Sequence, residues 1–393
     1  MFWVMFDTST TRDDYRDVHK LLASPAGSIV RYAFHDGNLS STAIAETGRT
    51  DLARNVLVAY AQPKTFKKGD AEPVGSLSLE QGFWVGTRLA TLRHLHHAAN
   101  RYQFYLELLG YPAFDEAAIN TIMRDLTAAG DVPFTKWVAI SNLNVEFNSL
   151  SSSSAHDNWA SIVDRLGSPP SQFAGDSFWR ISRITRGVQK ANIQPLIRYH
   201  TGVESGKETI TDLEAVFPLP ELDKFAIQIE SRTPDQGDET DRSRAVTIET
   251  SGDGPLKDLN NRSMVLRRLG SAWIEAEAGA TDRIDAHLLN IKFKTGPGIG
   301  DYPIGPEFSL QVQSTKHPLR RFLSFASGTV GVGCAAIGML KDHGTWAAIL
   351  VCGGVLLIQF SQYLWSGHIR LSGARMARSC LGIVSKGART IRR

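Results

Sequence analysis

The first 333 residues of this 393-residue chain contain no cysteine. The three cysteines are Cys334, Cys352 and Cys380, all near the C-terminus. Over the long N-terminal part, this absence excludes a disulfide framework, a thiol nucleophile and a cysteine-ligated zinc site. The cysteine usage is that of a protein in a reducing compartment.

The short motifs of common catalytic sites are also absent. The sequence contains no G-x-x-x-x-G-K-[ST], G-x-G-x-x-G, H-E-x-x-H or G-x-S-x-G. The acidic run that holds Asp235, Asp238 and Asp241 lacks the spacing and the final glutamate of a calcium-binding loop, so a solvated loop is expected there. We therefore expect no enzyme activity, no cofactor and no metal site.

Charge is missing from two long stretches, residues 322–340 and residues 346–365, which a five-residue turn connects. About 20 apolar residues are needed for a helix to cross the hydrocarbon core of a bilayer. Trp346, Tyr363 and Trp365 lie at the ends of the second stretch, where aromatic rings favour the headgroup level. The pattern predicts a transmembrane helical hairpin, and the alternative is a pair of buried core helices.

Basic residues flank this hairpin on both sides. Lys316, Arg320 and Arg321 precede it, and residues 370–393 add seven Lys and Arg residues without one Asp or Glu. Cytoplasmic segments carry the excess of positive charge, so both termini are expected in the cytoplasm, with two spans in the cell inner membrane.

Small and polar residues interrupt both apolar stretches. Small residues four apart, as in Ser324/Gly328 and Gly331/Ala335, allow helix backbones to approach closely. In one interpretation, the hairpin packs on itself as an anchor. In the other, several hairpins from a homo-oligomer form a pore. Its expected lining residues are Ser324, Gly328, Gly331, Gln359 and Gln362.

The net charge of +3 hides an asymmetry. From residue 308 onward there are 11 Lys and Arg residues and one Asp, whereas the rest of the chain has 32 basic and 39 acidic residues. The basic end suits an anionic membrane surface. An acidic body argues against long nucleic acid as a partner and leaves a small nucleotide or oligonucleotide possible.

The fold class expected is α+β, with an α/β domain over residues 1–190, a β-rich domain over 191–318, the hairpin over 319–366 and a basic tail over 367–393. In the first domain, the hydrophobic patterns predict strands and helices. The strands are 2–6, 28–34, 55–61 and 137–145, and the helices are a segment ending at residue 22, a long one over 79–109, then 113–129, 159–166 and 178–184. In the second domain, strands are expected at 215–217, 225–230, 245–249, 271–277, 287–294 and 308–313.

Two sets of residues are candidates for ligand binding. Arg93, His97 and Arg101 would share one face of the long predicted helix and could meet an anion, although a solvated face explains them as well and a metal or general-base role is a further alternative. Arg31 and Tyr32 lie near the end of the second predicted strand, where ligands of α/β sheets tend to bind. Arg49 and Arg54 flank the next strand and could converge there.

The layout of a large body followed by a C-terminal hairpin resembles the two-span membrane effectors of bacterial anti-phage systems, such as cyclic-oligonucleotide-signalled effectors and the Hailong-type channel protein. The resemblance implies a nucleotide or oligonucleotide ligand, oligomerisation and growth arrest through membrane depolarisation. We therefore expect a sensor whose hairpins form a ligand-gated pore. The alternative is a membrane-tethered enzyme or scaffold in which the hairpin is only an anchor.

Overall fold

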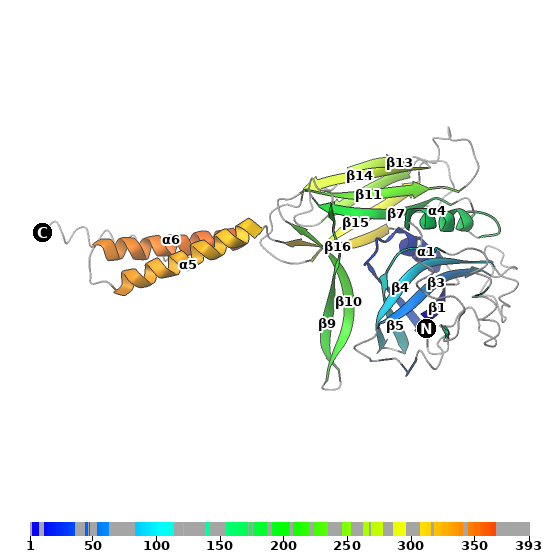
Figure 1. The fold of residues 1–393 in the computed structure, drawn as a ribbon, viewed down its shortest axis with the longest axis horizontal. Coiled ribbons are helices and arrows are strands. Elements are labelled where there is room, and N and C mark those ends of the chain that lie inside the picture. The colour runs from blue at the N-terminus through cyan, green and yellow to red at the C-terminus, as the bar shows by residue number, and fades with distance from the viewer. Residues whose placement is uncertain are drawn as a thin grey trace.

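The structure is a computed structural model in which the chain forms three sheets and a helical hairpin (Figure 1). It describes residues 2–7, 12–35, 44–45, 47, 53–62, 83–98, 100–113, 121, 138–140, 155–171, 173–174, 176–186, 191–204, 207–220, 224–234, 246–252, 262–266, 269–277, 286–295, 307–315, 318–340 and 345–366. In this described part, the chain is a sheet-rich α+β protein with four helices, which confirms the expected class.

The N-terminal sheet has six strands in the order β2-β5-β4-β3-β1-β6. The strands are β1 (Phe2–Asp7), β2 (Ile29–His35), β3 (Arg54–Gln62), β4 (Phe83–Ala98), β5 (Arg101–Leu108) and β6 (Val138–Ile140). Only β1 and β3 pair in parallel, and the other pairs are antiparallel. The sheet is therefore not the mainly parallel one that an α/β domain implies.

Helices α1 (Arg12–Ala23) and α4 (Ala155–Leu166) pack beside this sheet. Val18 and Leu22 of α1 join Trp159 of α4 and Tyr60 of β3 in one buried cluster. Both helices present apolar residues at steps of three or four, which places those residues on one face and buries that face.

The remaining strands form two sheets that pack face to face as a β-sandwich (Figure 1). One sheet has the order β13-β12-β15-β16-β10-β9, with β9 (Leu196–Glu204), β10 (Lys207–Pro220), β12 (Val246–Gly252), β13 (Arg262–Leu266), β15 (Ala286–Thr295) and β16 (Glu307–Thr315). The other has the order β14-β11-β7-β8, with β7 (Phe178–Arg186), β8 (Ala191–Asn192), β11 (Lys224–Arg232) and β14 (Leu269–Glu277). Alternate residues of both sheets fill the core between them, such as Ile227 and Ile229 of β11 against Leu289 of β15.

Strand β10 connects the sandwich to the N-terminal sheet. It pairs in parallel with β16 and antiparallel with β9. Its backbone also accepts hydrogen bonds from the N-terminal sheet, because the His94 ring Nε2 lies 2.9 Å from the Ile210 oxygen and the Tyr105 hydroxyl donates to Thr211. Strand β10 thus contacts both its own sheet and the N-terminal sheet.

The C-terminal helices α5 (Pro318–Leu340) and α6 (Thr345–Ser366) pack along one another and extend away from the sheets (Figure 1). A transmembrane helical hairpin was predicted over residues 319–366, and two helices are present there. By length and hydropathy, no helix in the described part of the chain qualifies as a membrane span.

The predicted helix over residues 79–109 is wrong. The segment is the antiparallel pair β4 and β5, with Asn100 at the turn in the left-handed region, at φ 60°. The register of β4 shifts between Leu92 and His94, so the buried residues Leu92 and Leu95 are three apart instead of two. That shift gives a strand the apolar spacing of a helix.

The predicted helix over residues 178–184 is wrong for the same reason. It is β7, and its pairing with β11 also shifts register, with Ile181 opposite Ile229 but Arg183 opposite Gln228. The buried residues Ile181 and Ile184 are again three apart. The first three predicted strands, the helix ending at residue 22, the helix at 159–166 and all six strands of the β-rich domain are present.

Strands β9 and β13 were not predicted. The predicted helix at 113–129 lies outside the described residues except at residues 113 and 121, and of the strand at 137–145 only Val138–Ile140 is described. The acidic residues Asp235, Asp238 and Asp241 also lie outside the described residues.

Candidate functional site

Arg31 and Tyr32 lie on β2, on opposite faces of the N-terminal sheet because neighbouring residues of a strand alternate. Tyr32 is buried in the core cluster, and its ring stacks on Phe34 with 6.2 Å between the centroids. Arg31 is exposed and lines a cavity against β10. Only Arg31 of this pair can therefore meet a ligand.

The other predicted ligand residues are spread over the same sheet. Arg93 donates to the Glu107 carboxylate on the neighbouring strand, and the His97 ring packs on Tyr102 at 4.4 Å. Arg93 and His97 are four residues apart in a strand, about 13 Å, so they do not share a site as they would on a helix. Three further residues complete the set: Arg54 begins β3, Arg101 begins β5 and Arg49 lies outside the described residues.

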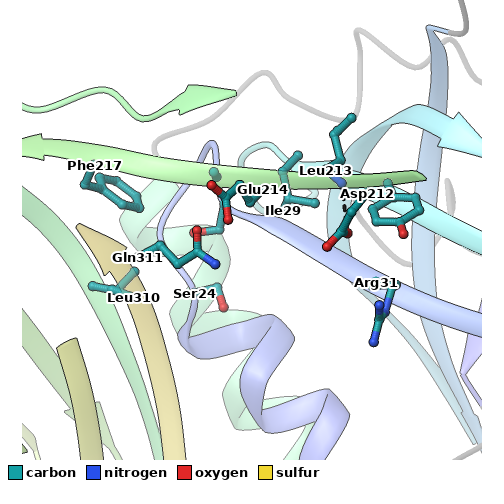
Figure 2. A pocket seen from close by; sticks show the side chains of 12 residues that line it. Ser24, Ile29, Arg31, Asp212, Leu213, Glu214, Phe217, Leu310 and Gln311 are labelled. Atoms are coloured by element: carbon teal, nitrogen blue, oxygen red, sulfur yellow. Dashed lines mark hydrogen bonds between the residues drawn. The ribbon is translucent and has the colours of Figure 1, made fainter. Parts of the chain in front are cut away.

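The cavity beside Arg31 has a volume of about 270 Å³ (Figure 2). Ser24, Ile29 and Arg31 reach it from the N-terminal sheet and the end of α1, and Asp212 and Glu214 reach it from β10. Asp212 and Glu214 belong to the sandwich and lie almost two hundred residues further along the chain than Ser24 and Arg31. No local pattern in the sequence signals such a long-range meeting.

The charges in this cavity do not suit an anion. The lining holds one guanidinium, that of Arg31, and two carboxylates, those of Asp212 and Glu214. Glu214 in turn lies 3.2 Å from the His200 ring nitrogen on β9. Burial, together with the nearby Asp212 charge, raises the pKa of Tyr105 at the same place, so its hydroxyl stays protonated and donates to backbone. Because Arg198 also pairs with Glu214, at 3.9 Å, the charges around the cavity are close to balanced and offer no positive excess to an anion.

A second and larger cavity, of about 520 Å³, lies between the N-terminal sheet and β7, β11 and β14. Arg88 and Arg180 line it, and both are buried. The sequence pattern placed Arg88 in the polar cluster of the long predicted helix, with Arg93 and His97, and did not single out Arg180. Arginines are seldom fully buried, so the burial of these two was not expected.

His19 of α1 and Asp176 form a buried pair under the sandwich, with 3.5 Å between His19 Nε2 and Asp176 Oδ2. The His19 ring stacks on Phe178, with 4.9 Å between the centroids. Burial lowers the pKa of His19 to about 4 and raises the pKa of Asp176 to about 7. At neutral pH the imidazole is therefore uncharged, and the two side chains lie close together without a full ion pair.

The residues predicted to line a pore lie partly at the contact between α5 and α6 of one hairpin. Ser324 hydrogen-bonds with Ser361, and a side chain at Gly328 would meet the Ser361 hydroxyl at 2.9 Å. A Cβ at Gly331 would lie 2.8 Å from the carbonyl oxygen of Gly354. The close approach expected from residues four apart is confirmed, and these small residues serve packing within the hairpin.

Gln359 lies on α6, and its amide oxygen is buried without a hydrogen-bond partner among the described residues. Gln362 lies on the same helix, and nothing is described of its side chain. An unsatisfied buried amide oxygen is costly, so a native structure usually supplies a donor. Among the described residues of the hairpin, Gln359 is the one with a buried side-chain polar atom that has no hydrogen-bond partner there.

The outer surface of the hairpin is apolar. Of the fourteen large hydrophobic side chains that are exposed in the described part of the chain, ten lie on α5 or α6. They are Phe322, Leu323, Phe325, Val330, Val332, Ile337, Trp346, Ile349, Leu356 and Phe360. Phe325 is 75% exposed and Trp346 is 73% exposed, so the rest of the described chain leaves both aromatic rings uncovered.

Comparison with known proteins gives no relative to guide the assignment, because no protein-family model matches the chain and no curated protein matches it.

Proposed function

We propose that this chain is a membrane-anchored receptor in which the α5–α6 hairpin is buried in a lipid bilayer and the sheets form a cytoplasmic body that binds a small ligand. The observation that carries the proposal is the apolar surface around the hairpin, which the rest of the chain leaves uncovered. Contiguous exposed apolar surface on this scale marks a contact with a membrane or another protein.

Charge favours lipid as the cover. Arg320 and Arg321 lie at the base of α5, and the segment after residue 369 is basic and has no acidic residue. Both basic segments flank the same end of the hairpin, where an anionic membrane surface would attract them. The turn at the other end offers only Lys341 and Asp342.

The residues that lower the hydropathy of α5 also support this reading. Ser324, Gly328 and Gly331 face α6, so the outside of the pair is more apolar than the composition of either helix. The hydroxyl of Thr329, which is exposed, donates to the Phe325 carbonyl one turn earlier and is satisfied within the helix. If α5 and α6 enter the bilayer as a pair, these polar groups are already satisfied within the pair, and lipid has to supply only apolar contact.

The proposal extends to a homo-oligomer that opens a pore when ligand binds. The support for this step is Gln359, whose buried amide oxygen has no donor within the described part of one chain. A second hairpin could supply that donor, and polar groups of this kind act as contacts between membrane helices. The nucleotide ligand and the anti-phage setting follow from the resemblance alone.

Liposome flotation of the full-length protein tests the membrane assignment. One variant carries Val332→Lys, Ile337→Lys and Leu356→Lys, and each lysine would cost about 2.5–3.5 kcal/mol near the bilayer centre. The matched control carries Leu196→Lys, Tyr199→Lys and Leu288→Lys, three exposed apolar residues of the sandwich. We expect the wild type and the control to float and the hairpin variant to stay behind. Equal flotation of the two variants would contradict the proposal.

Ion flux from the same liposomes tests the pore. We expect Gln359→Leu to abolish or alter the flux, and Phe360→Leu to leave it unchanged. Phe360 is the matched control because it is the next residue of α6 and is exposed and apolar. If the protein floats with the liposomes but conducts no ions, with or without nucleotides, the hairpin is only an anchor for a tethered enzyme or scaffold. Growth arrest and depolarisation on phage infection would test the defence role.

A further inference from the structure

The larger cavity collects positive charge at the junction of two sheets. Arg88 comes from β4, Arg180 and Arg183 come from β7, and the one acidic residue that lines it is Glu230 of β11. Gly110 and Tyr111, just after β5, close one side. Three guanidinium groups against one carboxylate leave an excess of two positive charges at a site of about 520 Å³.

Arg88 is the unusual member, because only 1% of its surface is exposed. Its Nε donates to the Leu109 carbonyl at 3.0 Å, and its Nη1 lies 3.5 Å from the Leu21 carbonyl. Its guanidinium carbon lies 3.9 Å from the centre of the Tyr111 ring. These contacts hold the side chain in place, yet none of them brings a negative charge. Burial lowers the pKa of Arg88, and the guanidinium of Arg180 lowers it further.

Arg180 differs, since its charge is matched within the protein. Its Nη2 lies 2.6 Å from Glu230 Oε2, and Nε donates to the same oxygen at 2.8 Å. Its guanidinium also lies over the Trp159 ring at 4.5 Å. Arg183, in contrast, is exposed on the same strand and lines the cavity. Within the described part of the chain, the charges left without a carboxylate partner are therefore those of Arg88 in the interior and Arg183 nearer the solvent.

We propose that this cavity binds a small phosphate monoester, whose phosphate group contacts the exposed Arg183, with the buried charge of Arg88 behind it. A phosphate monoester carries close to two negative charges at neutral pH, which equals the excess in the lining. The guanidinium of Arg183 offers a planar fork of N–H donors that fits phosphate oxygens. The volume exceeds what phosphate alone needs, and the partly exposed Trp273 offers apolar surface to an organic group.

The site lies between the two parts of the body, so the ligand would contact the N-terminal sheet and the sandwich together. The inference that this phosphate ester gates the pore rests on the proposed function. The inference that the cavity binds the ester does not. A protein that binds the ester but shows no flux or flotation would retain this inference and lose the proposed function. A protein that conducts ions but binds no phosphate would do the opposite.

Isothermal titration calorimetry on the detergent-solubilised full-length protein tests the inference with phenyl phosphate, inorganic phosphate, succinate and phenol as probes. We expect phenyl phosphate to bind, inorganic phosphate to compete with it, and phenol to show no binding. Tighter binding of succinate than of either phosphate would overturn the assignment to a phosphate ester. Absence of binding by both phosphates would overturn the site itself.

Arg183→Gln is the decisive variant, because an exposed side chain can be changed without loss of the fold. We expect it to weaken phenyl phosphate binding by roughly tenfold or more, as expected for the loss of one charge-assisted contact. Arg186→Gln is the matched control, since Arg186 is exposed three residues later on β7 and does not line the cavity. Equal binding by the two variants would contradict the proposal.

Discussion

Ser324 and Ser361 exchange hydrogen bonds across the hairpin. The Ser324 hydroxyl donates to the Ser361 carbonyl at 2.9 Å, and the Ser361 hydroxyl donates to the Ser324 carbonyl at 2.6 Å. Each serine thus serves a backbone oxygen of the other helix, and Ser324 is buried by the contact. The exchange fixes both the distance and the rotation of α5 against α6.

Because the two hydroxyls act on each other's backbone, Ser324→Ala and Ser361→Ala should not be additive. Interhelical hydrogen bonds of this kind contribute about 0.6 kcal/mol on average in membrane proteins. We expect each single variant to lower the thermal unfolding midpoint in detergent and the double variant to lower it by less than the sum. A double-mutant cycle on the full-length protein measures this, and strict additivity would contradict the exchange.

Two adjacent glycines of α6 should respond differently to the same change. A Cβ at Gly354 would lie 2.5 Å from the Gly331 carbonyl oxygen, whereas a Cβ at Gly353 would meet nothing within 4 Å. We expect Gly354→Ala to force the helices apart at a cost of about 1–3 kcal/mol. Gly353→Ala should be neutral or slightly stabilising, because alanine is the better helix former. Thermal unfolding in detergent compares the two, and a reversed order would contradict the packing.

The His19–Asp176 pair predicts opposite pH slopes for two variants. In Asp176→Asn only His19 titrates, with a pKa of about 4 in the folded protein and about 6.5 when unfolded. The unfolded state then binds the extra proton, so stability is present above pH 6.5 and falls by about 3 kcal/mol as the pH drops toward 4.

In His19→Asn the raised pKa of Asp176 remains, about 7 against 3.8. The folded state now binds the extra proton, so this contribution is present at low pH and is lost as the pH rises from 4 through 7. In the wild type each state holds one proton on the pair between pH 4 and 6.5, so the two effects nearly cancel. Unfolding midpoints at pH 4.5, 6 and 7.5 test all three proteins, and parallel profiles would contradict the buried pair.

The turn between β4 and β5 depends on Asn100, whose φ of 60° is unfavourable for most residues. A β-branched residue in the left-handed region costs about 1–2 kcal/mol, and glycine costs little. We expect Asn100→Val to lower the free energy of unfolding by that amount and Asn100→Gly to leave it nearly unchanged. Denaturant unfolding measures both, and equal effects would argue against this turn.

Local patterns predicted elements well where they were regular. Strand β11 alternates strictly between buried and less buried residues, and it was predicted. Strand β4 was predicted as a helix because shifts in register place buried leucines three apart, at Leu89, Leu92 and Leu95. Tyr102 and Phe104 are buried and lie two residues apart, which is the spacing of a strand. This spacing was the overlooked sign that the segment after β4 is the strand β5.

The binding sites were less predictable than the strands. Arg31 was selected and does line a cavity, but the same cavity is lined by the carboxylates of Asp212 and Glu214, which only the tertiary fold brings there. Arg88 and Arg180 are 92 positions apart in the sequence and meet through strands of different sheets. A composition or spacing rule carries no information about such a meeting, because it depends on how the sandwich docks.

The parallel pairing of β10 and β16 gives the body a mechanical connection to the hairpin. Val216–Pro220 runs alongside Gln311–Thr315, and α5 begins at Pro318. Three peptide steps span at most about 11 Å, so there is little slack between sheet and helix. A β-strand hardly stretches along its axis. Any sliding of β10 against the N-terminal sheet would therefore be transmitted along β16 and would displace the first residues of α5.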